Sequence, residues 1–207
     1  LLLLDEPLGA LDLKLRRQMQ IELKWIQTEV GITFVHVTHD QEEAMTMADT
    51  IAVMNKGRIE QMGSPVDLYE NPETVFVANF LGQSNLIEAT VQSNSGADTS
   101  VDIHGARIIL PSSRNKSSKN KVLVGVRPEK INIHPAGAAS GKNVLGDGLI
   151  TDISFVGVST QYLVEMPWKQ EIMVFEQNDG GALQIRKGDR VSLSWEPHFT
   201  FALDSEK

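Results

Sequence analysis

Residues 1–12 read LLLLDEPLGALD, and residues 37–49 read VTHDQEEAMTMAD. In the first stretch, four leucines are followed directly by two carboxylates and a proline, which is the pattern of a strand buried on both faces that ends at a polar rim. The second stretch continues the β-branched and aromatic run ITFVHV at residues 32–37, which predicts a second buried strand. The two stretches therefore predict an α/β fold with a parallel sheet.

Apolar residues between these strands recur at the spacing of one helix face, which predicts an amphipathic helix over residues 13–30. The stripe consists of Leu15, Met19, Leu23, Ile26 and Val30. Asp12 is the expected N-cap, and Gly31 is the expected C-terminal stop. A strand, a helix and a strand in succession form a right-handed crossover, so the two strands should lie side by side and parallel.

Polar residues follow each strand at its carboxyl end. Asp5 and Glu6 follow the leucines, and His39 follows the second strand. Parallel strands share a carboxyl edge, where ligands of open α/β folds bind, so we expect these three residues to converge there. Adjacent strand residues point to opposite faces. We therefore expect one carboxylate to face a hydrated Mg²⁺ and the other to accept a proton from an attacking water.

In the alternative without a ligand site, Asp5 and Glu6 are two solvent-facing acids at a strand end and His39 is a surface histidine beside a helix. The convergence of all three residues on one rim favours the ligand site. His36 lies inside the strand and is expected to be structural. His104, His134 and His198 lack the spacing of metal ligands and receive no role.

The chain continues with alternating elements up to Gly82 and then changes character. Asp40 with Glu43 predicts a capped helix over residues 41–49, two short strands follow at 51–54 and 58–62, and Ser64 with Pro65 opens another helix. A last helix is expected from Asn71-Pro72 to Leu81. Beyond Gly82 the β-rich segments are residues 86–91, 101–103, 107–110, 121–126, 130–133, 149–155, 161–166, 171–175, 190–195 and 199–203. Short strands with frequent turns predict a small barrel or sandwich.

Composition narrows the class of protein. The 207 residues carry a net charge of −8 and contain no cysteine, which excludes disulfides and thiolate metal sites. The acidic balance argues against a nucleic-acid partner, and the basic stretch RNKSSKNK at residues 114–121 is expected to be a solvated loop. No apolar run reaches the roughly 20 residues of a membrane span and no signal sequence opens the chain, so we expect a soluble, cytoplasmic protein.

With these residues in place, LLLLDEPLGALD and VTHDQEEAMTMAD resemble the Walker B, D-loop and switch-histidine segments of ABC transporter ATPases. Residues 49–72 resemble the end of the nucleotide-binding domain in the importer branch. The segments VRPE at 126–129 and WEP at 195–197 resemble its accessory OB-like barrel, the TOBE domain. The resemblance implies two domains, residues 1–82 from the nucleotide-binding domain and residues 83–207 from the TOBE domain.

The resemblance also implies roles for single residues. ATP and Mg²⁺ would be the cofactors, with Asp5 helping to hold Mg²⁺, Glu6 polarising the hydrolytic water and His39 contacting the γ-phosphate. The stretch Gly9 to Asp12 matches the D-loop, which touches the opposite subunit and places Asp12 at the nucleotide site. Gly9 departs from the serine that is usual there.

Two motifs of the family are missing from this sequence. A phosphate-binding loop needs G-x-x-x-x-G-K-[ST], and its nearest match, residues 137–143, is one residue short and ends in Asn143. The LSGGQ motif is also absent. In this family both motifs precede Walker B, so the resemblance implies a carboxyl-terminal fragment that hydrolyses no ATP alone. Such a fragment is expected to expose apolar surface and a sheet edge, and therefore to self-associate.

The implied parent is an importer ATPase at the cytoplasmic face of the cell membrane. Its partners would be a second copy of itself, the permease subunits and, indirectly, a solute-binding protein. Residues 33–47 and the two β-domain segments are most similar to spermidine/putrescine importers, although sugar, iron(III) and sulfate importers share much of the pattern. A regulatory or dimerisation β-module without ATPase activity remains the alternative, and the importer-type tail disfavours an ABC ATPase of DNA repair or translation.

Overall fold

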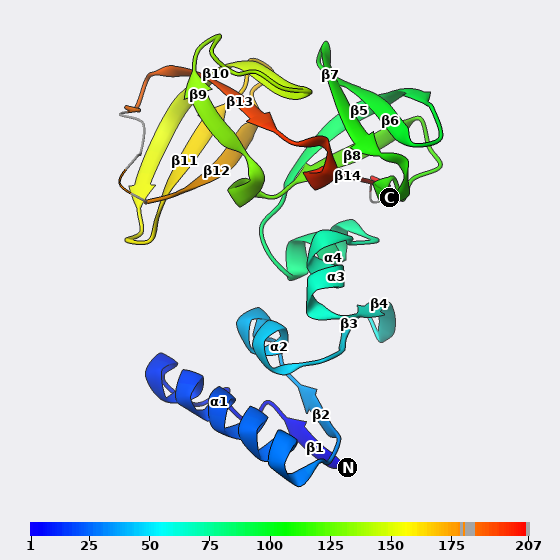
Figure 1. Ribbon diagram of the computed structural model, residues 1–207, viewed down its shortest axis with the longest axis vertical. Helices are drawn as coiled ribbons and strands as arrows, with labels where there is room; N and C mark the ends of the chain where they lie inside the picture. The colour runs from blue at the N-terminus through cyan, green and yellow to red at the C-terminus, as the bar shows by residue number, and fades with distance from the viewer. Residues whose placement is uncertain (179, 181–184, 206–207) are drawn as a thin grey trace. The chain divides into compact units, whose positions relative to one another are not determined.

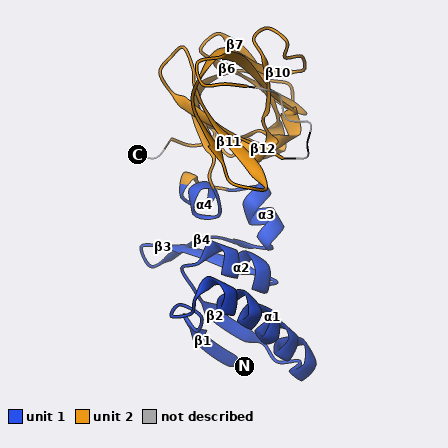
Figure 2. Cartoon of the chain, turned by 90° about the vertical axis from the view of Figure 1, so that its left-hand side faces the viewer, with its two compact units in different colours: residues 1–72, 76–82 blue, residues 73–75, 83–207 orange. Residues whose placement is uncertain are grey.

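The structure, a computed structural model, describes residues 1–178, 180 and 185–205 (Figure 1). The chain divides into two compact units (Figure 2). Unit 1 comprises residues 1–72 and 76–82, and unit 2 comprises residues 73–75 and 83–207. Unit 1 mixes helices and strands, whereas the regular elements that lie wholly in unit 2 are strands and short 3₁₀ turns.

Unit 1 alternates strands and helices. Its elements are β1 (Leu2–Asp5), α1 (Leu13–Val30), β2 (Phe34–Val37), α2 (Gln41–Met47), β3 (Ile51–Asn55), β4 (Arg58–Gly63), α3 (Pro65–Glu70) and α4 (Val75–Phe80). The predicted order of elements is confirmed. The last helix begins at Val75 and not at the Asn71-Pro72 step, because residues 71–74 form an irregular connection with bends at residues 71, 73 and 74.

The first strands form the predicted parallel pair. Leu2 lies opposite Phe34 and Asp5 opposite Val37, and the backbone N–H of Glu6 extends the ladder by donating to the carbonyl of Val37 at 2.9 Å. Helix α1 makes the crossover between them (Figure 1). Gly31 ends α1 at φ 66°, a conformation that glycine adopts without a steric penalty.

Ion pairs hold α2 against α1. Arg16 contacts Asp40 at 2.7 Å, Arg17 contacts Glu42 at 3.2 Å and Lys24 contacts Asp49 at 2.8 Å. The Arg17–Glu42 and Lys24–Asp49 pairs are largely open to solvent, so each of these two contributes little by itself, whereas Arg16 and Asp40 are each only 25% exposed. Together they fix the direction in which α2 leaves the end of β2.

The expectation that both strands are buried on both faces was wrong. Leu3 is 70% exposed and Val35 47% exposed, and they lie side by side on one face. Within the described residues this sheet has only two strands, and α2 meets its opposite face, where Glu43 contacts His36. The predicted α1 stripe is likewise only partly covered, since Leu15, Ile26 and Val30 are exposed.

The rest of unit 1 packs around its own small core. Strands β3 and β4 form an antiparallel hairpin, and α3 starts at the predicted cap, where the Ser64 hydroxyl accepts from the backbone N–H of Asp67. The buried apolar residues are Ile51, Val53, Leu68, Val77 and Leu81.

The described residues of unit 2 form two antiparallel five-stranded sheets. Its strands are β5 (Asn85–Asn94), β6 (Asp98–Ile103), β7 (Ala106–Pro111), β8 (Lys121–Val126), β9 (Asn132–Pro135), β10 (Asn143–Phe155), β11 (Ser159–Glu165), β12 (Glu171–Gln177), β13 (Arg190–Trp195) and β14 (Phe201–Leu203). One sheet has the order β12-β11-β10-β13-β9 and the other β14-β8-β5-β6-β7. Short 3₁₀ helices occupy Ser112–Arg114, Pro128–Lys130 and Pro197–Phe199.

Two buried asparagines join the sheets of unit 2. The Asn85 amide of β5 pairs with both backbone groups of Met173 in β12, at 2.8 Å each. The Asn143 amide of β10 makes the same pair of bonds with Ile109 in β7, again at 2.8 Å each. Because buried amides need partners, these bonds fix how the sheets meet around one apolar core.

The sequence located the strands of unit 2 and missed some of their ends. Strand β10 begins at Asn143, six residues before the predicted start, and bulges at two places. Strand β9 begins at Asn132, because Pro128–Lys130 forms a 3₁₀ turn. The edge strands β9 and β12 face each other across a cleft. This curled, barrel-like all-β unit agrees with the predicted OB-like class.

The exposed face of the β1–β2 sheet leads to a prediction. We expect this chain to self-associate through Leu3 and Val35, because covering an exposed apolar sheet face with a second copy lowers the free energy. Light scattering should show a mass that rises above 22.8 kDa with concentration. The double variant L3K/V35K should shift toward the monomer, whereas Ile59→Lys, at another exposed apolar strand position, should not. A monomer at every concentration would contradict the idea.

Candidate functional site

The structure brings Glu6 and His39 together at the carboxyl edge of β1 and β2. The Nδ1 atom of His39 lies 3.1 Å from Oε1 of Glu6, and the two side chains are 75% and 52% exposed. Glu6 follows β1 directly and His39 lies two residues beyond β2. The parallel pairing of the strands therefore places both groups on one rim, open to solvent.

Glu6 departs from strand geometry. Its φ of 44° lies in the left-handed region, which costs a non-glycine residue roughly 1–3 kcal/mol. The strict alternation expected for Asp5 and Glu6 therefore does not apply, since β1 ends at Asp5. Instead of continuing the strand, the backbone turns at Glu6, and the carboxylate reaches His39. Backbone strain of this kind occurs at functional sites, although Lys56, His104, Asp147 and Lys169 also have a positive φ.

Asp5 is the last residue of β1 and lies opposite Val37, exposed to solvent. No three histidine or carboxylate side chains among the described residues gather into a metal-ligand set. The chemistry of a single carboxylate still fits Mg²⁺, which keeps several waters and binds proteins through one or two carboxylates together with substrate phosphates. Asp5 therefore suits such a metal as one ligand.

Asp12 serves as the N-cap of α1. Its Oδ1 atom accepts from the backbone N–H groups of Lys14 and Leu15, each at 3.0 Å. The predicted cap is confirmed. The same side chain was expected at the nucleotide site through the D-loop resemblance, and no described contact joins it to Glu6 or His39.

A buried network behind the rim was missed by the sequence analysis. The Glu43 carboxylate, 3% exposed, accepts from the Thr38 hydroxyl at 2.7 Å and lies 2.6 Å from Nε2 of His36. His36 was expected to be structural, and this contact agrees with that role. The Asp40–Glu43 pair was read as a capping box, but only half of it forms. The backbone N–H of Glu43 donates to the Asp40 side chain, which is the half that forms. The Glu43 carboxylate accepts from the Thr38 hydroxyl instead of the Asp40 N–H, and the Asp40 N–H donates to that same hydroxyl.

Asp40 is held as a carboxylate at the start of α2. The backbone N–H of Glu43 donates to it, and this bond together with the Arg16 guanidinium lowers the pKa of Asp40 below its ordinary value, although burial acts in the opposite direction. A charged carboxylate here is also favoured by the positive end of the helix dipole. The turn that carries His39 is thus anchored immediately on its carboxyl side.

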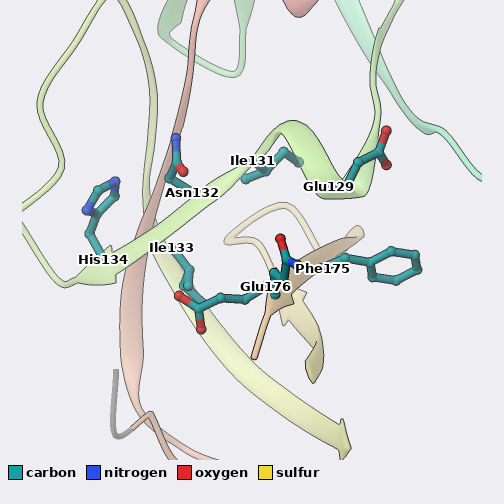
Figure 3. Close-up of a pocket in the computed structure, with 8 residues that line it drawn as sticks. Glu129, Ile131, Asn132, Ile133, His134, Phe175 and Glu176 are labelled. Atoms are coloured by element: carbon teal, nitrogen blue, oxygen red, sulfur yellow. The ribbon is translucent and has the colours of Figure 1, made fainter. Parts of the chain in front are cut away.

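Unit 2 has a separate cleft of about 350 Å³ between β9 and β12 (Figure 3). Its lining includes the carboxylates of Glu129 and Glu176, the His134 ring and the apolar side chains of Ile133 and Phe175. Figure 3 shows the Glu176 side chain reaching toward Ile133 across the cleft. The Tyr162 hydroxyl donates to Glu176 at 3.2 Å, and burial followed by the charge of Glu176 raises the pKa of Tyr162.

Comparison with known proteins finds similarity for both parts of the chain. The TOBE domain family matches residues 124–203. The spermidine/putrescine import ATP-binding protein PotA of Thermobifida fusca (strain YX) is 47% identical over 209 residues, covering 98% of this chain and 53% of that protein. Nearly the whole chain is therefore similar to import ATP-binding proteins of this kind. It spans about half the length of the curated relatives that it matches.

Other relatives of this importer type agree. The protein of the same name from Rubrobacter xylanophilus is 44% identical and matches 100% of this chain and 54% of its own length, and that of Methylococcus capsulatus is 41% identical over 98% and 52%. Among solved structures, the molybdate-binding protein ModG aligns with 58% of the chain and 96% of its own, at a TM-score of 0.49 and 15% identity. No helix in the described part of the chain has the length and apolar character needed to span a membrane.

The cap at Asp12 leads to a prediction about the start of α1. Asp12→Ala removes the acceptor of two backbone bonds and should destabilise the first turn of α1 by about 1 kcal/mol. Hydrogen exchange should therefore accelerate at the amides of Lys14 and Leu15, by about fivefold. Asp12→Asn keeps an acceptor and serves as the matched control. Unchanged exchange in Asp12→Ala would show that the cap contributes nothing in solution.

Proposed function

We propose that the protein carrying this chain is the ATP-hydrolysing subunit of an ABC importer. The observation that carries the proposal is the placement of Glu6 against His39 at 3.1 Å on the rim that follows β1 and β2. Glu6 is the general base that takes a proton from the attacking water, and its half-exposed carboxylate leaves room for that water. Asp5 would hold Mg²⁺ as one carboxylate ligand.

His39 orients the reacting groups. Its Nδ1 faces Glu6, so its Nε2 is turned to the other side of the ring and is free to contact a γ-phosphate oxygen of ATP. The metal supplies charge neutralisation at the phosphates when it is bound. Asp12, the N-cap of α1, belongs to the same nucleotide site as part of the D-loop stretch. That stretch contacts a second copy of the subunit.

The wider assignments rest on the relatives. Their names describe spermidine/putrescine import, so the transported solute is a polyamine, with sugar, iron(III) and sulfate importers as the alternatives. The subunit works as a homodimer on permease subunits at the cytoplasmic face of the cell membrane, and a solute-binding protein delivers the polyamine. Residues 1–82 belong to the nucleotide-binding domain and residues 83–207 to the TOBE domain.

This chain by itself should not hydrolyse ATP. Its sequence contains neither the G-x-x-x-x-G-K-[ST] loop that surrounds the phosphates nor the LSGGQ motif. The activity therefore belongs to the full-length protein, and the catalytic test uses that protein.

Replacement of the general base tests the proposal. In the full-length protein, Glu6→Gln should lower the rate of ATP hydrolysis by about 10²- to 10⁴-fold, because the amide cannot accept the proton. The affinity for ATP should stay within about twofold, since the base acts on water and not on the nucleotide. A phosphate-release assay and a nucleotide-binding titration measure the two quantities.

Glu22→Gln, the same change at an exposed position of α1, is the control and should leave both quantities unchanged. Hydrolysis at the wild-type rate in Glu6→Gln would refute the catalytic assignment. Uptake of labelled spermidine into cells that lack their own importer tests the solute separately. Uptake that depends on Glu6 supports polyamine transport, whereas Glu6-dependent hydrolysis without spermidine uptake points to one of the other solutes.

The cleft of unit 2 favours a second function, the binding of a small ligand that regulates the subunit. The cleft of about 350 Å³ is lined by two carboxylates, an imidazole and apolar side chains, a combination that suits a small organic cation. The bond from Tyr162 holds the Glu176 carboxylate in place at its edge.

Calorimetric titration of the whole chain with spermidine tests this second function. We expect spermidine to bind. The variant Glu176→Gln should lower the affinity at least about fivefold, because the cation loses one charged partner. Glu88→Gln, on an exposed position of β5, should bind as tightly as the wild type. Absence of binding, or equal weakening by both variants, would exclude the cleft as a cation site.

A further inference from the structure

The turn that carries His39 is closed by a ring of hydrogen bonds. The N–H of Asp40 donates to the Thr38 hydroxyl at 3.0 Å, and that hydroxyl donates to Oε2 of Glu43 at 2.7 Å. The N–H of Glu43 in turn donates to Oδ1 of Asp40 at 3.0 Å. His39 lies between Thr38 and Asp40, so both of its chain neighbours are fixed while its own side chain stays 75% exposed.

Glu43 is the buried anchor of this ring. It lies in the first turn of α2 and is 3% exposed, although carboxylates are rarely buried unless they are paired. Its second oxygen, Oε1, lies 2.6 Å from Nε2 of His36, which is inside β2. One carboxylate thus connects the strand, the turn and the helix that follow one another through residues 36–43.

We propose that Glu43 is a positioning residue that, through the Thr38 hydroxyl, holds His39 in place against Glu6. The proposal rests on the proposed ATPase function, because it assigns Glu43 a role in the same site. Glu43 touches neither of the reacting groups, and its effect on the reaction passes through the position of His39. Misplacement of a group by about 1 Å is enough to cost about 100-fold in rate.

The ring distinguishes this role from simple stabilisation of the fold. If the buried polar network served stability alone, breaking it would destabilise the protein, and the turnover of the protein that remained folded would be unchanged. A positioning network loses turnover in protein that is still folded. The Thr38 hydroxyl is the link to test, because valine has the same shape and lacks the hydroxyl, whereas serine keeps it.

Variants at residue 38 of the full-length protein provide the experiment. Thr38→Val should lower kcat by about 10- to 100-fold and leave KM for ATP within about twofold, and Thr38→Ser should restore most of kcat. Thr46→Val removes a hydroxyl that bonds only to backbone carbonyls within α2 and should leave kcat unchanged. Glu43→Ala should repeat the effect of Thr38→Val wherever it folds, as judged by circular dichroism.

The outcomes separate the positioning role from the catalytic assignment. If Thr38→Val keeps the wild-type kcat, or if Thr38→Ser fails to restore it, Glu43 does not position His39. If Glu6→Gln and His39→Ala both hydrolyse ATP at the wild-type rate, the proposed function itself fails. Loss of activity in those two variants together with full activity in Thr38→Val overturns only the positioning role.

Discussion

The rim of unit 1 depends on the parallel pairing of β1 with β2, which ends where the N–H of Glu6 donates to the carbonyl of Val37 at 2.9 Å. A parallel pair requires a crossover, which α1 provides, and it brings the carboxyl ends of both strands to the same edge. Two chain segments more than thirty positions apart thus deliver a carboxylate and an imidazole within 3.1 Å. Without that register, the Glu6 carboxylate, which extends from a backbone with φ 44°, would not lie beside His39.

The sequence was sufficient for the elements that depend on local patterns. The caps at Asp12 and Ser64, the glycine stop at Gly31 and the parallel strand pair all follow from residue type and spacing. The approach of Glu6 to His39 also follows, because it needs only the shared edge of two parallel strands. The φ of Glu6 could not be predicted, since alternation along a strand gives no sign of where the backbone leaves the strand.

Long-range burial was the other part that the sequence did not reveal. Glu43 looked like the second member of a capping box, and its local spacing is correct for one. Its carboxylate instead accepts a hydrogen bond from Thr38 and lies 2.6 Å from the His36 ring, because α2 folds back over β2 and buries it. The Asn85 and Asn143 amides of unit 2 are similar. Each amide forms the two hydrogen bonds that a neighbouring strand would form with a residue of the other sheet. The partners are 88 and 34 residues apart in the sequence, and no local pattern indicates such a pair.

These buried polar groups have a common physical consequence. An apolar contact tolerates sliding, whereas a buried amide or carboxylate that loses its partner incurs a desolvation penalty of about 1–3 kcal/mol. Asn85 and Asn143 therefore permit one register between the sheets of unit 2, and Glu43 permits one path for the turn between β2 and α2. The His39 and Glu6 side chains at the rim are themselves 75% and 52% exposed. The buried groups behind the rim therefore constrain the backbone from which His39 extends, and they leave its side chain open to solvent.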